Sequence, residues 1–295
     1  RVTSGDVRAF AGRGPAEAGP AARPEPEATV ERPSPAPLVS HPLPTATEAP
    51  ELPDFGRWGE VERLPLRSVR RATARHMALA WSQIPHVSHQ DVADVTKLEA
   101  FRQKHKDRVA AQGGSLTLTV FVIKAAVAAL KAYPRFNASL DAAAGEIVLK
   151  KYYHVGLAVD TERGLLVPVI RDADRKSVTE LAIELRDLVT RTRAGQAGLE
   201  ELQGGTFTIT NPGSLGGTGF AAIVNHPEVA ILGTARASWQ PVVRGKGKKA
   251  PIVPRFLLPL VLSFDHRVVD GADAARFVSK IVELLQDPAD LLMLS

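Results

Sequence analysis

The chain has 295 residues, 44% of them hydrophobic, which is ample for a large core, and 37 basic residues nearly balance 32 acidic ones. A net charge of +5 spread this thinly is not typical of a nucleic-acid-binding protein. The absence of cysteine excludes disulfides, thiolate nucleophiles and cysteine-ligated zinc, so any thiol chemistry must come from a substrate or cofactor.

The N-terminal part has the composition of a linker. Residues 1–10, RVTSGDVRAF, fit the last turn of a small helical module capped by Thr3 or Ser4, with a disordered leader as the alternative. Residues 11–54 are rich in proline and alanine and almost lack large apolar side chains, so they cannot bury enough surface to offset their ordering entropy. We expect an extended, flexible linker there. The chain begins with Arg1 instead of Met, as a fragment would, and shows no signal peptide.

From Phe55 the composition becomes globular. A basic amphipathic helix is predicted over residues 68–83, followed by a strand over 86–92. His86 and His89 are three apart in that strand and point to opposite faces, which argues against a joint metal site. Thr96 and Glu99 match a capping box for a helix reaching about residue 112.

The next helix, over residues 118–131, is apolar on almost all sides and is therefore predicted to be the buried central element. The longest apolar stretch of the chain, residues 116–130, is interrupted by Lys124 and is short for a membrane span. Strands follow at 146–150 and 152–160, a tight turn at 161–164 makes a hairpin, and Ser177 with Glu180 caps a helix that ends near residue 193.

A strand over residues 206–210 precedes a glycine-rich loop at 211–219. This loop lacks the lysine and spacing of a P-loop, so we expect its glycines to let the backbone approach a substrate closely. Two further strands, 229–234 and 256–264, bracket a basic turn at 244–249, which suits a solvated hairpin tip better than a phosphate site.

The chemistry of the chain centres on the corner that follows the last strand. Asp265, His266, Arg267 and Asp270 interrupt an apolar run just before a helix begins at Gly271. Histidine can take a proton from a thiol at neutral pH. A structural alternative exists for each neighbour: Asp270 can be the helix N-cap, and Asp265 can pair with Arg267.

The heptad DHRVVDG closely resembles the active-site signature of the acyltransferase component of 2-oxo acid dehydrogenase complexes, a family related in fold to chloramphenicol acetyltransferase. The likeness extends from about residue 55 to 295 and includes IPHVSHQDVADVTKLEAFR and TFTITNPGSLGG. It implies a chloramphenicol-acetyltransferase-like two-layer α/β fold, with a mixed β-sheet and flanking helices, in a trimeric building block. It also implies that residues 1–10 end a peripheral subunit-binding domain, 11–54 form the linker and 55–295 form the catalytic domain.

In this family the histidine acts as general base and a serine or threonine hydroxyl stabilises the oxyanion. The resemblance assigns these catalytic roles to His266 and Thr210, while Asp270 orients the local structure. Thr210 could otherwise be an ordinary β-branched strand residue. The family's coenzyme A contacts map onto Arg102, Thr117, Asp160, Thr210, Asn211, and the main chain at Ala235 and Ala237.

The implied reaction moves an acyl group from a dihydrolipoyl carrier, which this chain lacks, to coenzyme A, without a metal. Segments such as VNHPEVAILG look most like the acetyltransferases of pyruvate dehydrogenase complexes, whereas Asn211 also suits succinyl and branched-chain members. A non-catalytic scaffold and a free-standing small-molecule acetyltransferase remain open as different classes of function. The implied partners are copies of the chain in trimers of a cubic core, a 2-oxo acid dehydrogenase and dihydrolipoamide dehydrogenase, with no nucleic acid or membrane.

The family's sites form between subunits of the trimer, with His266 and Thr210 from different chains. The apolar tail at 291–294 would suit burial between trimers. A bacterial cytoplasm is the expected location, with the mitochondrial matrix as the alternative.

Overall fold

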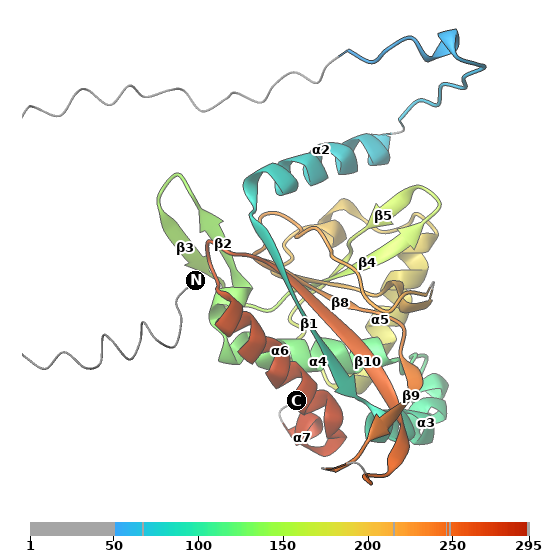
Figure 1. Cartoon of the computed structure of the whole chain (residues 1–295), viewed down its shortest axis with the longest axis vertical. Helices are drawn as coiled ribbons and strands as arrows, with labels where there is room; N and C mark the ends of the chain where they lie inside the picture. The colour runs from blue at the N-terminus through green and yellow to red at the C-terminus, as the bar shows by residue number, and fades with distance from the viewer. Residues whose placement is uncertain (1–50, 67, 215, 246, 248, 294–295) are drawn as a thin grey trace, which may run out of the picture. The chain divides into compact units, whose positions relative to one another are not determined.

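A computed structural model describes residues 51–66, 68–214, 216–245, 247 and 249–293 (Figure 1). The chain divides into two units, residues 1–62 and 63–295. In the first unit, the described residues form a short 3-10 turn, η1 (Phe55–Arg57). The expected remnant at 1–10 and the expected linker at 11–54, apart from residues 51–54, lie outside the described residues.

The second unit is built on a mixed sheet, and within the described residues eight strands belong to it. The main order is β1-β10-β8-β7-β4-β5, with β6 paired to β4 and β9 paired to β10. The pairs β4–β7 and β7–β8 are parallel and the others are antiparallel. The strands of this sheet are β1 (His86–Asp94), β4 (Val155–Thr161), β5 (Gly164–Leu166), β6 (Val169–Ile170), β7 (Phe207–Thr210), β8 (Ala230–Thr234), β9 (Ser238–Val243) and β10 (Ile252–Asp265). A separate hairpin pairs β2 (Ala138–Asp141) with β3 (Glu146–Leu149).

Helices α3 to α7 cover one face of this sheet and enclose the main core, and the described residues of that core include none from α2 (Figure 1). The central one, α4, is buried on nearly all sides, as its all-round apolar sequence predicts, and packs against α5 and α6. Its Lys124 is buried too, and its ammonium donates to the carbonyl of Lys176 at 2.8 Å. The helices are α2 (Ser68–Gln83), α3 (Thr96–Ala111), α4 (Leu118–Ala132), α5 (Val178–Arg193), α6 (Gly271–Gln286) and α7 (Pro288–Met293), with short 3-10 turns η2 (Pro134–Asn137), η3 (Leu199–Leu202) and η4 (Pro212–Ser214).

The predicted fold class, a mixed sheet with flanking helices, is confirmed. The capping box at Ser177 and Glu180 forms, and the helix that it starts ends at Arg193 as predicted. The capping box expected at Thr96 and Glu99 was wrong. Thr96 instead donates its hydroxyl to Asp94 and accepts the N–H of Phe256 at 2.8 Å, so the hydroxyl is not available to cap α3.

The sequence pattern also failed to predict β9, which contains Pro241. Proline cannot donate to a strand ladder, and within sheets it occurs mainly on edge strands, at strand starts and at bulges. β9 is such an edge, because its described pairing is with β10 alone.

Candidate active site

The corner after β10 presents an exposed histidine. β10 ends at Asp265, and His266 follows with its backbone N–H donating to the carbonyl of Pro85 at 3.2 Å. Its ring lies 5.9 Å from that of Phe264, at 30° to it. Neither ring nitrogen of His266 has a hydrogen-bond partner among the described residues, so both are available to a substrate.

The residues on either side of His266 hold this corner in place. Arg267 binds the carboxylate of buried Asp265 through its side chain at 2.7 to 3.2 Å and through its own backbone N–H at 3.0 Å. Asp270 is the N-cap of α6 and accepts the N–H of Asp273 at 2.9 Å. The backbone N–H groups of Asp273 and Ala272 hold the pKa of Asp270 below its usual range, assisted by the charge of Arg276. Both structural alternatives therefore form, and in this chain they fix the backbone that presents His266.

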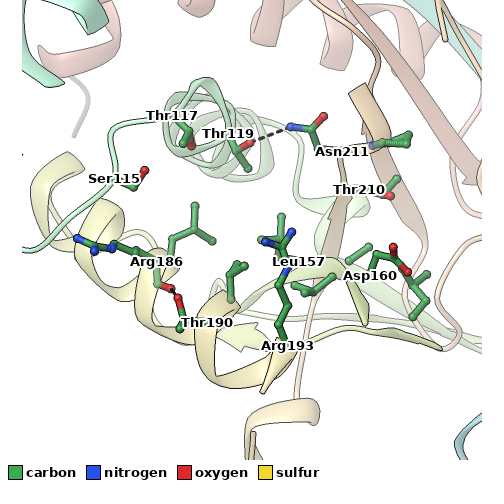
Figure 2. A pocket seen from close by; sticks show the side chains of 16 residues that line it. Ser115, Thr117, Thr119, Leu157, Asp160, Arg186, Thr190, Arg193, Thr210 and Asn211 are labelled. Carbon is green, nitrogen blue, oxygen red and sulfur yellow. Dashed lines mark hydrogen bonds between the residues drawn. The ribbon is translucent and has the colours of Figure 1, made fainter. Parts of the chain in front are cut away.

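A second group of candidate residues lines a cavity of about 660 Å³ between α4, α5 and the sheet (Figure 2). This volume lies in the range of small-molecule and cofactor sites. Thr117, Asp160, Thr210 and Asn211 all contribute to its wall. The full lining is Ser115, Thr117, Thr119, Leu157, Ala158, Val159, Asp160, Leu165, Leu185, Arg186, Val189, Thr190, Arg193, Thr210, Asn211 and Pro212.

Some polar side chains of this wall have hydrogen-bond partners within the described part of the chain and others have none there. The Asn211 side chain donates to Thr119 Oγ1 at 3.0 Å and accepts the N–H of Gly213 at 3.0 Å, so its orientation is fixed. The Thr117 Oγ1 atom is buried without a hydrogen-bond partner in the described residues, and the same part of the chain offers none to the Thr210 hydroxyl. Both hydroxyls therefore keep unused hydrogen-bonding capacity at the cavity wall.

Ala235 and Ala237 line a smaller cavity of about 130 Å³, which shares Asn211 and Thr119 with the larger one. The glycine-rich loop reaches this point because Gly213 has no side chain. A Cβ there would lie 2.7 Å from the carbonyl oxygen of Ala235. The glycine of this loop thus permits a close approach of two backbone segments beside the cavity.

Arg102 is not among the lining residues. Its guanidinium binds both carboxylate oxygens of Glu99 at 2.7 and 2.8 Å and donates to the carbonyl of Leu116 at 3.1 Å. The Glu99 carboxylate raises the pKa of Arg102. In this chain, Arg102 therefore supports the segment that leads to Thr117 instead of facing the cavity.

His266 and Thr210 lie at opposite ends of the sheet. Thr210 pairs with Gly233, which pairs with Val261, and His266 comes five residues after Val261 along β10. At about 3.3 Å per residue, the two are separated by roughly 16 Å along the strand direction alone. One chain therefore does not bring this base and this hydroxyl together.

The cavity also contains residues that the sequence pattern did not single out. Arg186, Thr190 and Arg193 all come from α5, and Ser115 comes from the loop before α4. The signal for the first three was their spacing of i, i+4 and i+7, which places them on one helix face.

Metal and membrane features were searched over the same described residues. No group of three or more histidines, aspartates or glutamates there could hold a metal ion. None of the described helices has the length and apolar character needed to cross a bilayer.

Comparison with known proteins gives a consistent result. The sequence model of the family described as 2-oxoacid dehydrogenases acyltransferase (catalytic domain) matches residues 59–293. The dihydrolipoyllysine-residue acetyltransferase component of the pyruvate dehydrogenase complex from Haemophilus influenzae is 45% identical over 242 residues, which are 81% of this chain and 42% of that protein. This chain thus spans about half the length of the curated relatives that it matches.

Two solved structures are each 44% identical to the chain, with a TM-score of 0.78, and cover 83% of it and all of their own chain. One is Azotobacter vinelandii dihydrolipoamide acetyltransferase, studied for the role of a serine, a histidine and an asparagine in its catalytic mechanism. The other is the cubic core of a pyruvate dehydrogenase multienzyme complex.

Proposed function

The chain belongs to the 2-oxoacid dehydrogenase acyltransferase family, and we propose that it transfers an acetyl group from an S-acetyldihydrolipoyl carrier to coenzyme A, as the core enzyme of a pyruvate dehydrogenase complex. The observation that carries this proposal is the cavity of about 660 Å³. It gathers Thr117, Asp160, Thr210 and Asn211, which the family resemblance assigned to coenzyme A, from distant segments of the chain.

In the proposed mechanism, an unprotonated ring nitrogen of His266 accepts the proton of the coenzyme A thiol, whose pKa of about 8.5 leaves it mostly protonated at pH 7. The thiolate attacks the thioester carbonyl and forms a tetrahedral oxyanion, which accepts a hydrogen bond from the Thr210 hydroxyl. When the intermediate collapses, the carbon–sulfur bond to the dihydrolipoyl group breaks. That sulfur takes the proton back from His266, so the base is regenerated.

We propose that each active site combines His266 of one chain with Thr210 of its neighbour in a trimer. The separation of roughly 16 Å along the strands supports this arrangement, because no side-chain rotation could close it. The similarity to a cubic core supports a trimeric building block and a large assembly. The apolar tail supports burial between trimers, because Met293 of α7 is 85% exposed in the single chain while Leu291 is buried within it.

Asp270 is proposed to position His266 and not to relay charge. The histidine and the asparagine studied in the Azotobacter vinelandii enzyme are four residues apart, as are His266 and Asp270. An aspartate or asparagine at this position can cap the following helix equally well. Asp270 does so here through the N–H of Asp273.

The two-chain site can be tested by mixing two inactive variants, His266→Ala and Thr210→Val. In randomly assembled trimers, about a quarter of the sites would then combine an intact His266 with an intact Thr210 across an interface. Activity near that fraction is expected after the two variants are unfolded and refolded together, whereas variants refolded separately and then mixed serve as the control. If no activity is recovered, the two-chain site is refuted: His266 and Thr210 then either act within one chain or do not belong to the same site.

The reaction itself is tested by measuring acyl transfer between coenzyme A and dihydrolipoamide with acetyl, succinyl and isobutyryl donors. A clear acetyl preference is expected. A preference for succinyl or isobutyryl would assign the chain to a sister complex, and no transfer by an assembled particle would favour a non-catalytic scaffold.

We further propose that residues 1–10 end a peripheral subunit-binding domain, that 11–54 are a flexible linker and that 55–295 are the catalytic domain. The proposed partners are a 2-oxo acid dehydrogenase and dihydrolipoamide dehydrogenase, in a bacterial cytoplasm. The bacterial relatives support this location.

A further inference from the structure

The large cavity carries more positive than negative charge. Its lining includes Arg186 and Arg193 but a single carboxylate, that of Asp160. Within the described residues neither arginine forms an ion pair, whereas Arg102 is paired with Glu99 and Arg191, also on α5, is paired with Glu201. Uncompensated guanidinium groups at a cavity wall attract an anionic ligand, and their planar donor geometry suits phosphate.

The two arginines are arranged along the cavity. They are seven residues apart on α5, which puts them on one face and about 10 Å apart along the helix axis. Figure 2 shows Arg186 beside Ser115 at the end far from Thr210, with Arg193 between that end and Asp160. The two ends of the cavity therefore differ: the Thr210 hydroxyl lies at one end and the Arg186 guanidinium at the other.

Arg186 is also held in place. Its Nη1 atom donates to the carbonyl of Gly113 at 3.1 Å. The backbone N–H of Ser115 donates to the carbonyl of Ala182, also on α5, at 3.1 Å. These two bonds join the loop before α4 to α5, and they leave the other N–H groups of Arg186 free to bind a ligand.

We propose that Arg186 binds the ribose 3′-phosphate of coenzyme A and that Arg193 binds its diphosphate. This inference rests on the proposed function, because a thiol that reacts at Thr210 directs the nucleotide end of the molecule, with all three phosphates, towards Arg186. It assigns to two residues of α5 the charge recognition that Arg102, engaged by Glu99, does not provide inside the cavity.

The test uses isothermal titration of the assembled protein with coenzyme A and with 3′-dephospho-coenzyme A. The variants are Arg186→Gln, Arg186→Lys and Arg193→Gln. Arg108→Gln is the matched control, since it makes the same charge change at an exposed position of α3 that does not line the cavity. Each melting temperature is recorded so that a folding defect is detected separately.

We expect the unaltered protein to bind coenzyme A roughly 10- to 100-fold more tightly than the dephospho form, as a charge-assisted contact predicts. Arg186→Gln should abolish this preference while leaving affinity for the dephospho form unchanged. Arg186→Lys should keep part of the preference, because it retains the positive charge. Arg193→Gln should weaken both ligands alike, and Arg108→Gln neither.

Retention of the full preference by Arg186→Gln would overturn the assignment of the 3′-phosphate while coenzyme A binding itself stands. Equal loss of both ligands in Arg186→Gln would show that this residue supports the Gly113 loop instead. Failure of the unaltered protein to bind either ligand would refute the proposed function and not only this inference.

Discussion

The buried carboxyl of Glu228 leads to a prediction about the pH dependence of stability, which does not depend on the proposed function. Its side chain is only 4% exposed, just before β8. Its Oε1 atom accepts a hydrogen bond from Asn225 at 3.2 Å. Burial raises the pKa of this carboxyl from 4.5 to about 7.

The direction of the pH effect on stability follows from comparing the protonation of Glu228 in the folded and the unfolded chain. Below about pH 4.5 the carboxyl is protonated in both the folded and the unfolded chain, and ionisation costs nothing. As the pH rises to about 7, the unfolded chain releases the proton while the folded chain retains it, so the free energy of unfolding falls. The rise in pKa corresponds to about 3 kcal/mol, which is lost by pH 8.

Glu228→Gln should remove this pH dependence, because an amide does not ionise. The substitution can lower stability at every pH by leaving a buried amide N–H unpaired, so the informative quantity is the change between pH 5 and pH 8. Relative to Glu228→Gln, the unaltered protein should lose about 6 to 12 °C more in melting temperature over this range, at 2–4 °C per kcal/mol for a domain of this size.

The assay is circular dichroism melting at fixed scan rate and protein concentration, because unfolding of a large assembly depends on both. Glu146→Gln is the control, since that glutamate is exposed on β3. Parallel melting temperatures for the unaltered protein and Glu228→Gln from pH 5 to 8 would refute the reasoning.

Three further predictions concern the corner and the cavity. His266→Ala should reduce acetyl transfer by roughly 10²- to 10⁴-fold with coenzyme A binding intact, measured by steady-state rates and titration; near-normal turnover would discard the base. Thr210→Val should reduce kcat by roughly 10²- to 10³-fold at similar KM, and a Ser substitution should restore the rate, so an inactive Thr210→Ser would argue against a hydroxyl role. Asp270→Ala should lower the free energy of unfolding by about 1 kcal/mol in denaturant titrations, whereas Asp270→Asn should keep both stability and activity, since either side chain can accept the N–H of Asp273. Loss of activity in a stable Asp270→Asn would show that its charge is needed.

The sequence was most informative where local interactions decide the structure. Ser177 and Glu180 form their capping box, and Asp270 caps α6, because each needs only a partner three residues away. Thr96 and Glu99 have the same local pattern, but their side chains bind other groups and do not cap the helix. The N–H of Phe256, 160 residues away, takes the Thr96 hydroxyl, and Arg102 takes the Glu99 carboxylate.

The residues of the candidate site likewise fall into those that a local motif predicts and those that only the packing of the fold reveals. Thr210, Asn211 and His266 were found because each lies in a short motif, and such a motif can be matched without knowing what surrounds it. Arg186 and Arg193 lie in no motif. Their importance arises only when α5 packs beside α4 and the sheet, so that one polar stripe of a surface helix becomes a cavity wall.

Arg102 was singled out because the family's coenzyme A contacts map onto it, whereas the arginines of α5 have no such match, and the structure shows that these arginines differ in charge pairing. A guanidinium that is already bound to a carboxylate contributes a fixed scaffold, whereas an unpaired one beside a cavity contributes affinity. The sequence shows which residues are basic but not which of them are compensated. In this chain that distinction follows from the contact of Arg102 with Glu99 one turn away and from the absence of any carboxylate partner for Arg186 among the described residues. A basic residue on a predicted helix is therefore better judged by the carboxylates within its reach than by its match to a motif.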